Sequence, residues 1–258
     1  MNATNDSKGY ARVLDIPADY LRELNLGLRA SRTLPEALAV DFVQLFAAVL
    51  PDAAPEVRAQ LATHVPITQR LARAGALLAA HCDDDALSQL ATHTSDTVRG
   101  AVAYAIAATP ITAADPISVH IACFVALADD PHFGVREWAW LALRPALHLD
   151  VRASIAAMVP YTAHASHNVR RFAVEALRPR GVWCKHLEPL KKNPEQARAL
   201  LEPLRAEPHE YPQDSVANWL NDAAKTQPEW VHALCTQWLQ CSPDAATQRI
   251  AKRALRSL

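Results

Sequence analysis

The stretch REWAWLALRP, residues 136–145, returns as RRFAVEALRP at residues 170–179, a spacing of 34 residues without a gap. A Val-Arg pair stands at the same phase in three copies, at residues 98–99, 135–136 and 169–170. A helical unit of this length cannot bury its apolar stripe alone, so successive copies stack against one another. The repeat predicts an all-α fold, an α-solenoid of HEAT-like helical repeats with a concave face.

Apolar residues recur at helical spacing between short Pro, Asp and His breaks, and no stretch alternates as a β-strand does. The chain of 258 residues is 50% hydrophobic, with 6 glycines and 18 prolines. Such a composition is typical of an all-helical protein whose helices end at prolines. We predict helices at residues 17–31, 34–49, 55–63, 67–82, 85–93, 96–108, 116–129, 133–144, 150–159, 166–178, 193–205, 213–225, 228–239 and 243–257.

The repeats extend through the second half of the chain. In DSVANWLNDAAK, Val216 takes the phase that Val169 holds 47 residues earlier, and the last helix, QRIAKRALRS, repeats Ala-Leu-Arg. No linker or low-complexity segment divides the chain. We therefore expect one HEAT-like repeat domain over residues 1–258, with an N-terminal helical part at 1–94 and the best-matched repeats, which carry the candidate site, at 95–258.

The five cysteines are odd in number and form no CxxC pair, which favours a reducing compartment. The N-terminal stretch MNATNDSKGYARV has no apolar core, so we expect no secretory signal. No apolar run approaches the roughly 20 residues that span a bilayer. We expect a cytoplasmic protein, in the bacterial cytosol or nucleoid, that is monomeric and contacts no membrane.

Charge is divided unevenly along the chain, although the net charge is −1. Residues 1–130 hold 9 Lys and Arg against 15 Asp and Glu, a balance of −6, and residues 131–258 hold 17 against 12, a balance of +5. The basic half favours an anionic partner. Chance variation on a solvated surface is the alternative explanation.

Three carboxylates share the repeat frame. Glu175 aligns with Asp222 one repeat later and with Leu141 one repeat earlier. Glu137 lies one helical turn before Leu141, on the same helical face. The frame therefore places Glu137, Glu175 and Asp222 along one surface of three successive repeats. A basic row is predicted beside them, made of Arg144, Arg178, Lys225 and Arg256.

Two interpretations of these acids stay open. In one, they pair with Arg171, Arg178 and Lys225 and bridge adjacent helices. In the other, they supply negative charge for an oxocarbenium-like sugar or a base made cationic by alkylation, and one of them orients or deprotonates water. The basic row, with the amides of Asn218 and Asn221, would then bind a phosphate backbone.

The six tryptophans all lie in the second half of the chain. Trp138 aligns with Phe172 and Trp219, which is a packing position. Trp140 and Trp183 do not fit that row and are better candidates for a site, where an aromatic face would attract a cation.

Longer motifs carry a family resemblance. The chain resembles the AlkC branch of the HEAT-like repeat alkylpurine DNA glycosylases in FGVREWAWLALRP, NVRRFAVEALRPRGVWCKHLEPLK, LLEPLRAEPHEYPQDSVANWLNDAAKTQPEWV and RALRSL, and also in NLGLRASRTLPEALAVDF and SDTVRGAVAYAI. The resemblance implies a monofunctional glycosylase that hydrolyses the N-glycosidic bond of 3-methyladenine and 3-methylcytosine in double-stranded DNA, initiating base excision repair. It also implies a concave DNA-binding face and action without full base flipping.

The resemblance suggests roles for single residues. Glu137, Glu175 and Asp222 match the site acids of the family, and Trp183 matches its site tryptophan. The candidate substrate- and DNA-binding residues, from the repeat frame and the matching segments, are Trp183, Trp140, Arg144, Arg178, Arg180, Asn218, Asn221 and Lys225.

Other features limit the expectations. Some relatives carry a C-terminal β-sandwich that helps to grip DNA; this sequence ends at RALRSL, and we expect no such domain and an altered DNA affinity. HCDDD and CKH lack the second half of a zinc site, and no nucleotide-binding motif occurs, so we expect neither metal nor cofactor. Two alternative functions are a non-catalytic HEAT-repeat scaffold and a protein that binds DNA lesions without chemistry.

Overall fold

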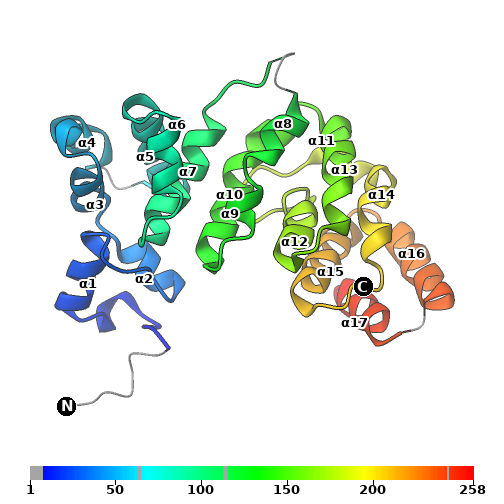
Figure 1. Ribbon diagram of the computed structural model, residues 1–258. Helices are drawn as coiled ribbons and strands as arrows, with labels where there is room; N and C mark the ends of the chain where they lie inside the picture. The colour runs from blue at the N-terminus through cyan, green and yellow to red at the C-terminus, as the bar shows by residue number, and fades with distance from the viewer. Residues whose placement is uncertain (1–7, 63–64, 113–115, 243) are drawn as a thin grey trace. The chain divides into compact units, whose positions relative to one another are not determined.

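The protein is helical throughout the part of the chain that the computed structural model describes, residues 8–62, 65–112, 116–242 and 244–258 (Figure 1). Its regular elements there are α-helices and short 3₁₀ helices, with no strand among the described residues. The predicted all-α helical-repeat fold is therefore confirmed. In the same residues, no helix combines the length and the apolar character needed to cross a membrane.

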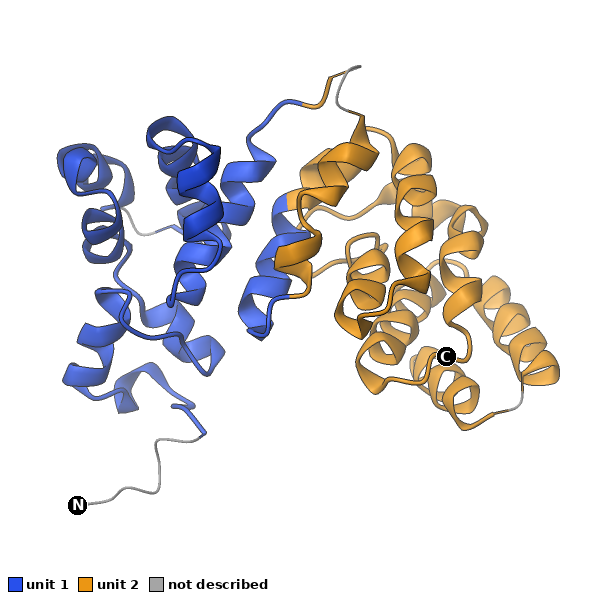
Figure 2. Ribbon diagram, in the orientation of Figure 1, with its two compact units in different colours: residues 1–110, 130–142 blue, residues 111–129, 143–258 orange. Residues whose placement is uncertain are grey.

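The helices form two compact units (Figure 2). Unit 1 comprises residues 1–110 and 130–142, and unit 2 comprises residues 111–129 and 143–258. Helix α10 (Phe133–Leu147) contributes its first part to unit 1 and its end to unit 2. The single domain over residues 1–258, with a division at residue 94, stays a prediction.

Unit 1 is built on close contact between α5 (Ile67–His81) and α7 (Asp96–Ala107). Gly75 permits this contact, because a Cβ there would lie 2.5 Å from the Cβ of Tyr104. The other elements of unit 1 are η1 (Val13–Asp15), α1 (Ala18–Asn25), α2 (Leu34–Ala39), α3 (Phe42–Val49), η2 (Pro51–Ala53), α4 (Ala54–Leu61) and α6 (Asp84–Leu90).

Unit 2 packs α12 (His167–Glu175) against α15 (Glu210–Ala224), and α15 in turn against α17 (Ala245–Ala254). The indole of Trp219 is fully buried there and donates to the carbonyl of Leu177 at 2.9 Å. The other elements of unit 2 are α8 (Ile117–Ala122), α9 (Val125–Ala128), α11 (Val151–Met158), η3 (Val159–Ala163), α13 (Glu188–Lys192), η4 (Pro194–Ala197), α14 (Arg198–Leu201), η5 (Glu202–Leu204) and α16 (Pro228–Cys241).

Several predicted helices are divided in the structure. The segment predicted at 34–49 breaks before Asp41, because the Asp41 side chain accepts from the amides of Val43 and Gln44 and begins a new helix. The segment at 116–129 divides into α8 and α9. Prolines at the starts of η4 and η5 interrupt the segment at 193–205.

Other helix boundaries also differ from the predictions. Helix α10 continues past residue 144, through Pro145, to Leu147, and α13 was not predicted. The predicted helix end at residue 63 and the predicted start at residue 243 lie outside the described residues.

The repeat shows itself in two equivalent loops, HTSDTVR at residues 93–99 and HASHNVR at residues 164–170. In the first, Arg99 donates to the carbonyl of His93 at 2.5 Å, and in the second Arg170 donates to the carbonyl of His164 at 2.8 Å. In each, the histidine Nδ1 accepts from the amide two residues on. The shared phase of the Val-Arg pairs therefore corresponds to one repeated loop geometry.

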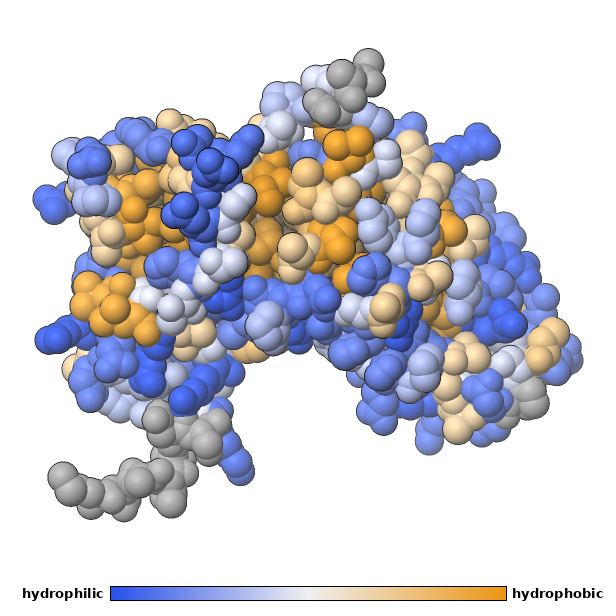
Figure 3. Space-filling view, in the orientation of Figure 1, coloured by the Kyte–Doolittle hydropathy of each residue, from blue (hydrophilic) through white to orange (hydrophobic). Residues whose placement is uncertain are grey.

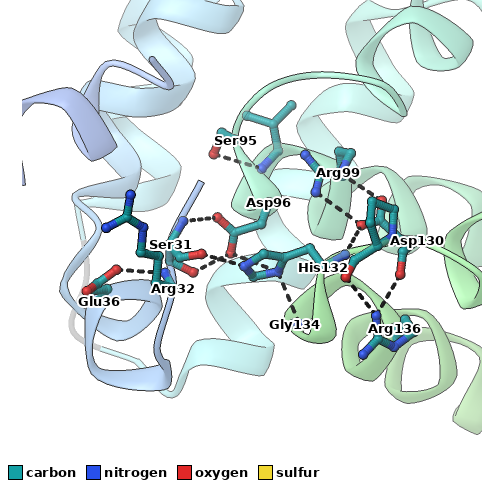
Figure 4. A network of polar contacts seen from close by, with 12 residues as sticks. Ser31, Arg32, Glu36, Ser95, Asp96, Arg99, Asp130, His132, Gly134 and Arg136 are labelled. Carbon is teal, nitrogen blue, oxygen red and sulfur yellow. Dashed lines mark hydrogen bonds and ion pairs between the residues drawn. The ribbon is translucent and has the colours of Figure 1, made fainter. Parts of the chain in front are cut away.

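Each of these arginines also reaches an acid in a later loop. Arg99 Nε lies 2.8 Å from Asp130 Oδ2, within unit 1 (Figure 4). Arg170 Nη2 lies 2.7 Å from Glu207 Oε1, within unit 2. The pairs join consecutive repeats, and all four side chains are largely buried.

Candidate functional site

The predicted site acids of unit 2 lie on two helices in contact, α12 and α15. Ser166 caps α12 by accepting from the amide of Asn168, and the apolar stripe of the helix buries Val169 and Phe172. This burial turns the last residue of the helix, Glu175, toward α15. The repeat frame, which aligned residues 47 apart, thus corresponds to helices packed side by side.

Glu175 is held by three partners and is only 4% exposed. Its Oε1 accepts from Arg178 Nη1 at 2.7 Å. Its Oε2 accepts from Ser215 Oγ at 2.6 Å, and Arg171 Nη2 lies 3.9 Å from the same oxygen. Both carboxylate oxygens are therefore engaged.

Asp222 is also 4% exposed, but its two oxygens have unequal partners. Arg178 approaches Oδ2 with Nε at 3.0 Å and Nη2 at 2.9 Å. Lys225 Nζ lies 3.7 Å from Oδ1, a longer contact. The Asp222 carbonyl accepts from Arg180 Nε at 3.2 Å.

The two acids have opposite pKa shifts. Burial raises the pKa of Glu175, but Arg171, Arg178 and the hydroxyl of Ser215 outweigh burial and leave the pKa below its usual value. Burial also raises the pKa of Asp222, and there Arg178 and the other donors do not cancel it, so the pKa stays above its usual value.

We name Arg171, Glu175, Arg178, Asp222 and Lys225, with Ser215, the acid–arginine cluster. The pairing of the acids with Arg171, Arg178 and Lys225, one of the two interpretations open from the sequence, is present in the structure. Arg178 lies between both acids and joins α12 to α15. Because paired charges can also serve a site, this geometry does not remove the second interpretation.

Ser215 was missed in the sequence. It is buried, and its hydroxyl makes one of the shortest contacts to Glu175. The available signal was its register on α15, since residues 215 and 222 are seven apart and share a helical face.

Arg144 is not on an exposed basic row. It is 1% exposed and donates to the carbonyls of Ala176 at 2.6 Å, Arg178 at 2.5 Å and Lys185 at 3.3 Å. It thereby fastens the backbone that follows α12, and burial lowers the pKa of its guanidinium. Because Arg144 is buried and binds backbone carbonyls, it stabilises the backbone next to the site. We therefore leave Arg144 out of the row predicted to bind phosphates.

The segment after α12 forms a loop that presents Trp183. The loop is closed at its base, where the amide of Leu187 donates to the carbonyl of Pro179 at 3.0 Å. Trp183 is 53% exposed, and its φ is 60°. This is a left-handed backbone conformation, which residues other than glycine adopt only at a cost in energy. Strained residues of this kind often occur at functional sites.

The two asparagines of α15 differ in role. Asn221 is buried and donates to the carbonyl of Ala254 and to Ser257 Oγ, both at 3.0 Å, which ties α15 to the end of α17. Asn218 is partly exposed, and its Oδ1 accepts from Arg256 Nη2 at 2.9 Å. Only Asn218 therefore has a side chain near the surface.

Glu137 and Trp140 belong to unit 1. The indole nitrogen of Trp140 donates to Glu137 Oε2 at 2.7 Å, and Trp140 is 3% exposed. Trp140 is thus a buried partner of the acid, which differs from the accessible aromatic face expected from the sequence. A role for Glu137 in the site stays a prediction.

Other polar groups, in a pocket of unit 1 and in the motif HCDDD, have structural roles. A pocket of about 700 Å³ in unit 1 contains Asp41 and Arg70, but Asp41 caps α3 and Arg70 donates to backbone carbonyls. Figure 3 shows hydrophobic residues over α3 to α5 and mainly hydrophilic ones over α16. Among the described residues, no group of three or more His, Cys, Asp or Glu is placed to hold a metal. Asp83, of the motif HCDDD, caps α6.

The sequence of this chain is similar to that of a bacterial protein over part of its length. No family model matches the chain. Over 117 residues, or 45% of its length, the chain is 38% identical to an uncharacterized protein, YhaZ, of Bacillus subtilis (strain 168), and covers 32% of that protein.

Solved structures give longer matches. The Pseudomonas fluorescens alkylpurine DNA glycosylase AlkC, bound to DNA containing an abasic site analog, is 30% identical with a TM-score of 0.66, over 84% of this chain and 60% of AlkC. The chain thus spans less than two thirds of both YhaZ and AlkC.

Two structures from Streptococcus mutans share the fold at lower identity. AlkD2 has a TM-score of 0.60 and 15% identity, over 80% of this chain and 98% of AlkD2. The protein smu.31 of strain UA159 has a TM-score of 0.55 and 17% identity, over 74% of this chain and 98% of its own. The resemblance that the motifs indicated is therefore confirmed: the structural neighbours of this chain are AlkC- and AlkD-type DNA glycosylases, and the chain shares their helical-repeat fold.

Proposed function

We propose that this protein is a monofunctional DNA glycosylase that hydrolyses the N-glycosidic bond of cationic alkylated bases, 3-methyladenine and 3-methylcytosine, in double-stranded DNA. The observation that carries the proposal is the combination of the AlkC match with two buried acids at the same repeat phase. The ion pairs that join consecutive repeats bring one arginine to one acid, whereas Arg178 is shared by two buried acids. Base excision repair would begin with this reaction, without metal or organic cofactor.

Asp222 is the acid best suited to the reacting centre. Hydrolysis develops positive charge at the sugar C1′, and a fixed carboxylate stabilises that charge. Burial raises the pKa of Asp222, which is the direction that favours accepting a proton from the attacking water. Its Oδ1 has only the longer contact to Lys225.

Glu175 would position the other groups of the cluster. Its partners engage both oxygens, and its low pKa keeps it charged. It would fix Arg178, which in turn fixes Asp222. Trp183, at the exposed tip of its loop, would contact the nucleotide, and Arg180, Asn218 and Lys225 would hold the DNA backbone.

A second candidate function is favoured by one observation. Because both acids are ion-paired, they are also suited to orient Arg178 and Lys225 for phosphates. The protein would then bind DNA lesions without chemistry.

Base release distinguishes the two candidates. Wild type, Asp222→Asn and Glu175→Gln are incubated with duplex DNA bearing 3-methylcytosine, and with methylated genomic DNA as a source of 3-methyladenine, under single-turnover conditions. We expect Asp222→Asn to lower the rate of base release about 10²- to 10³-fold, as loss of one preorganised group does in other enzymes.

A matched control is Asp214→Asn, because Asp214 is an acid on the same helix whose partly exposed side chain pairs with Arg249 and Arg253, outside the cluster. Its rate should stay within about twofold of wild type, since exposed ion pairs contribute little. Folded wild-type protein that binds both DNAs but frees no base would support the lesion-binding function instead.

A further inference from the structure

Basic side chains outnumber acids around Asp222. The cluster holds two carboxylates, Glu175 and Asp222. Five basic side chains contact the carboxylates or the adjoining backbone, namely Arg144, Arg171, Arg178, Arg180 and Lys225. A cationic base or sugar that approached this assembly would therefore compete with basic side chains for the carboxylates.

The basic side chains differ in how easily they can move away from the carboxylates. Side-chain exposure is 9% for Arg171 and 13% for Arg178, and Arg144 is buried beneath the loop. Lys225 is 49% exposed and sits at the end of α15, one turn after Asp222. Arg178 cannot leave without stranding two buried acids, whereas Lys225 can turn to solvent by rotating its own side chain.

We propose that Lys225 exchanges partners when DNA binds: it covers Asp222 Oδ1 in the free protein and moves to a DNA phosphate in the complex. The exchange frees Oδ1 for the cationic centre of a damaged nucleotide. This inference rests on the proposed function, since it concerns the same acid.

The exchange is favourable on simple electrostatic grounds. The 3.7 Å contact between Lys225 and Asp222 is long, and its lysine end is hydrated. A phosphate offers the ammonium group a new anion, and counterions released from the DNA add to the gain. Asp222 then loses one neutralising charge while Arg178 still holds its Oδ2.

The exchange has a consequence for selectivity. Undamaged DNA would draw Lys225 away but offer no cation, so Asp222 would be left buried with one oxygen unsatisfied. A cationic nucleotide would satisfy that oxygen. Preference for positively charged lesions would therefore come from the free carboxylate, and the lysine would contribute equally to every DNA.

The test measures binding of two duplexes that differ in one charge. One contains a neutral tetrahydrofuran abasic analogue, and the other contains a cationic pyrrolidine analogue of the sugar. Affinities of wild type, Lys225→Gln, Asp222→Asn and Lys252→Gln are measured by fluorescence anisotropy over a range of salt concentrations. Lys252→Gln is the matched control, since Lys252 is an exposed lysine on α17 in the same unit.

We expect wild type to prefer the cationic duplex and Asp222→Asn to lose that preference. Lys225→Gln should bind both duplexes several-fold more weakly, with an unchanged ratio between them. Its slope of log affinity against log salt should fall by about 0.9, the value for one lost phosphate contact. Lys252→Gln should keep the wild-type ratio.

Two results would overturn the inference. If Lys225→Gln increases the preference for the cationic duplex and leaves the salt slope unchanged, Lys225 stays on Asp222 in the complex. If wild type binds both duplexes equally, Asp222 does not meet a cation at all. These readouts are independent of base release, so a wild type that shows the expected binding but frees no base would contradict the proposed function and leave the lysine exchange standing.

Discussion

The polar network of unit 1 and the acid–arginine cluster of unit 2 use similar residues in different ways. In unit 1, Asp96 is 1% exposed and accepts from the amide and the hydroxyl of Ser31, each at 2.8 Å (Figure 4). Asp130 accepts from the amide of His132 at 2.7 Å in addition to Arg99. In the acid–arginine cluster of unit 2, Glu175 and Asp222 are held mainly by charged side chains.

This difference has a physical consequence. A backbone amide cannot leave its carboxylate unless the loop unfolds, so the unit 1 acids fix the positions of loops. A half-exposed side chain such as Lys225 can exchange partners by rotating, so we expect Asp222 to be able to respond to a ligand. We therefore expect the kind of donor, rather than burial alone, to separate structural acids from functional ones.

The largest effect is expected when the cluster loses its central cation. Arg178→Met leaves Glu175 and Asp222 buried without their shared partner. We expect a loss of about 3–5 kcal/mol in the free energy of unfolding, measured by urea denaturation, as for other broken buried ion pairs. A loss below about 1 kcal/mol would mean that the acids protonate or find new partners.

A smaller effect, confined to stability, is expected in unit 1. Asp96→Ala leaves the amide and hydroxyl of Ser31 without an acceptor, which should cost about 1–3 kcal/mol of unfolding free energy. Base release per folded molecule should stay at the wild-type rate. A loss of rate without a loss of stability would contradict the contrast between the two networks.

The smallest expected effect is a difference in how the stability contributions of Glu175 and Asp222 depend on pH. The pKa of Glu175 is lowered, so its ionised form contributes stability above its ordinary value of 4.5, and that contribution is lost as pH falls through the lowered pKa. The pKa of Asp222 is raised above 3.8, so the folded protein binds this proton more readily, and stability falls as pH rises through the window above 3.8.

Unfolding free energies measured between about pH 3 and pH 7 should therefore diverge. The deficit in unfolding free energy of Glu175→Gln relative to wild type should shrink as pH is lowered. The unfolding free energy of Asp222→Asn should increase relative to that of wild type as pH is raised. Parallel curves for the two variants would show that the acids share one environment.

Much of the fold was predictable because its signals are local. The ten-residue repeat at 136–145 and 170–179 predicted the stacking of helices, and the phase of Glu175 and Asp222 predicted their shared surface. Helix breaks such as the one at Asp41 were not predicted, since a capping side chain competes there with apolar periodicity.

The roles of single charges were harder to predict. Arg144 and Arg178 occupy the same repeat phase, yet one binds carbonyls in the interior and the other binds two acids. Trp140 differs in the same way from its expected exposure. Neither the residue type nor the phase contains that information.

The sequence by itself determined that this protein is an α-helical repeat, which residues share a phase, and which family its motifs resemble. Those properties follow from short-range periodicity and from long motifs. Only the tertiary structure decided which charges share a partner, because the contacts of Asp222 with Arg178 and of Arg144 with Lys185 join residues 44 and 41 positions apart. Such contacts depend on how closely helices pack, because a hydrogen bond requires a donor–acceptor distance of about 3 Å.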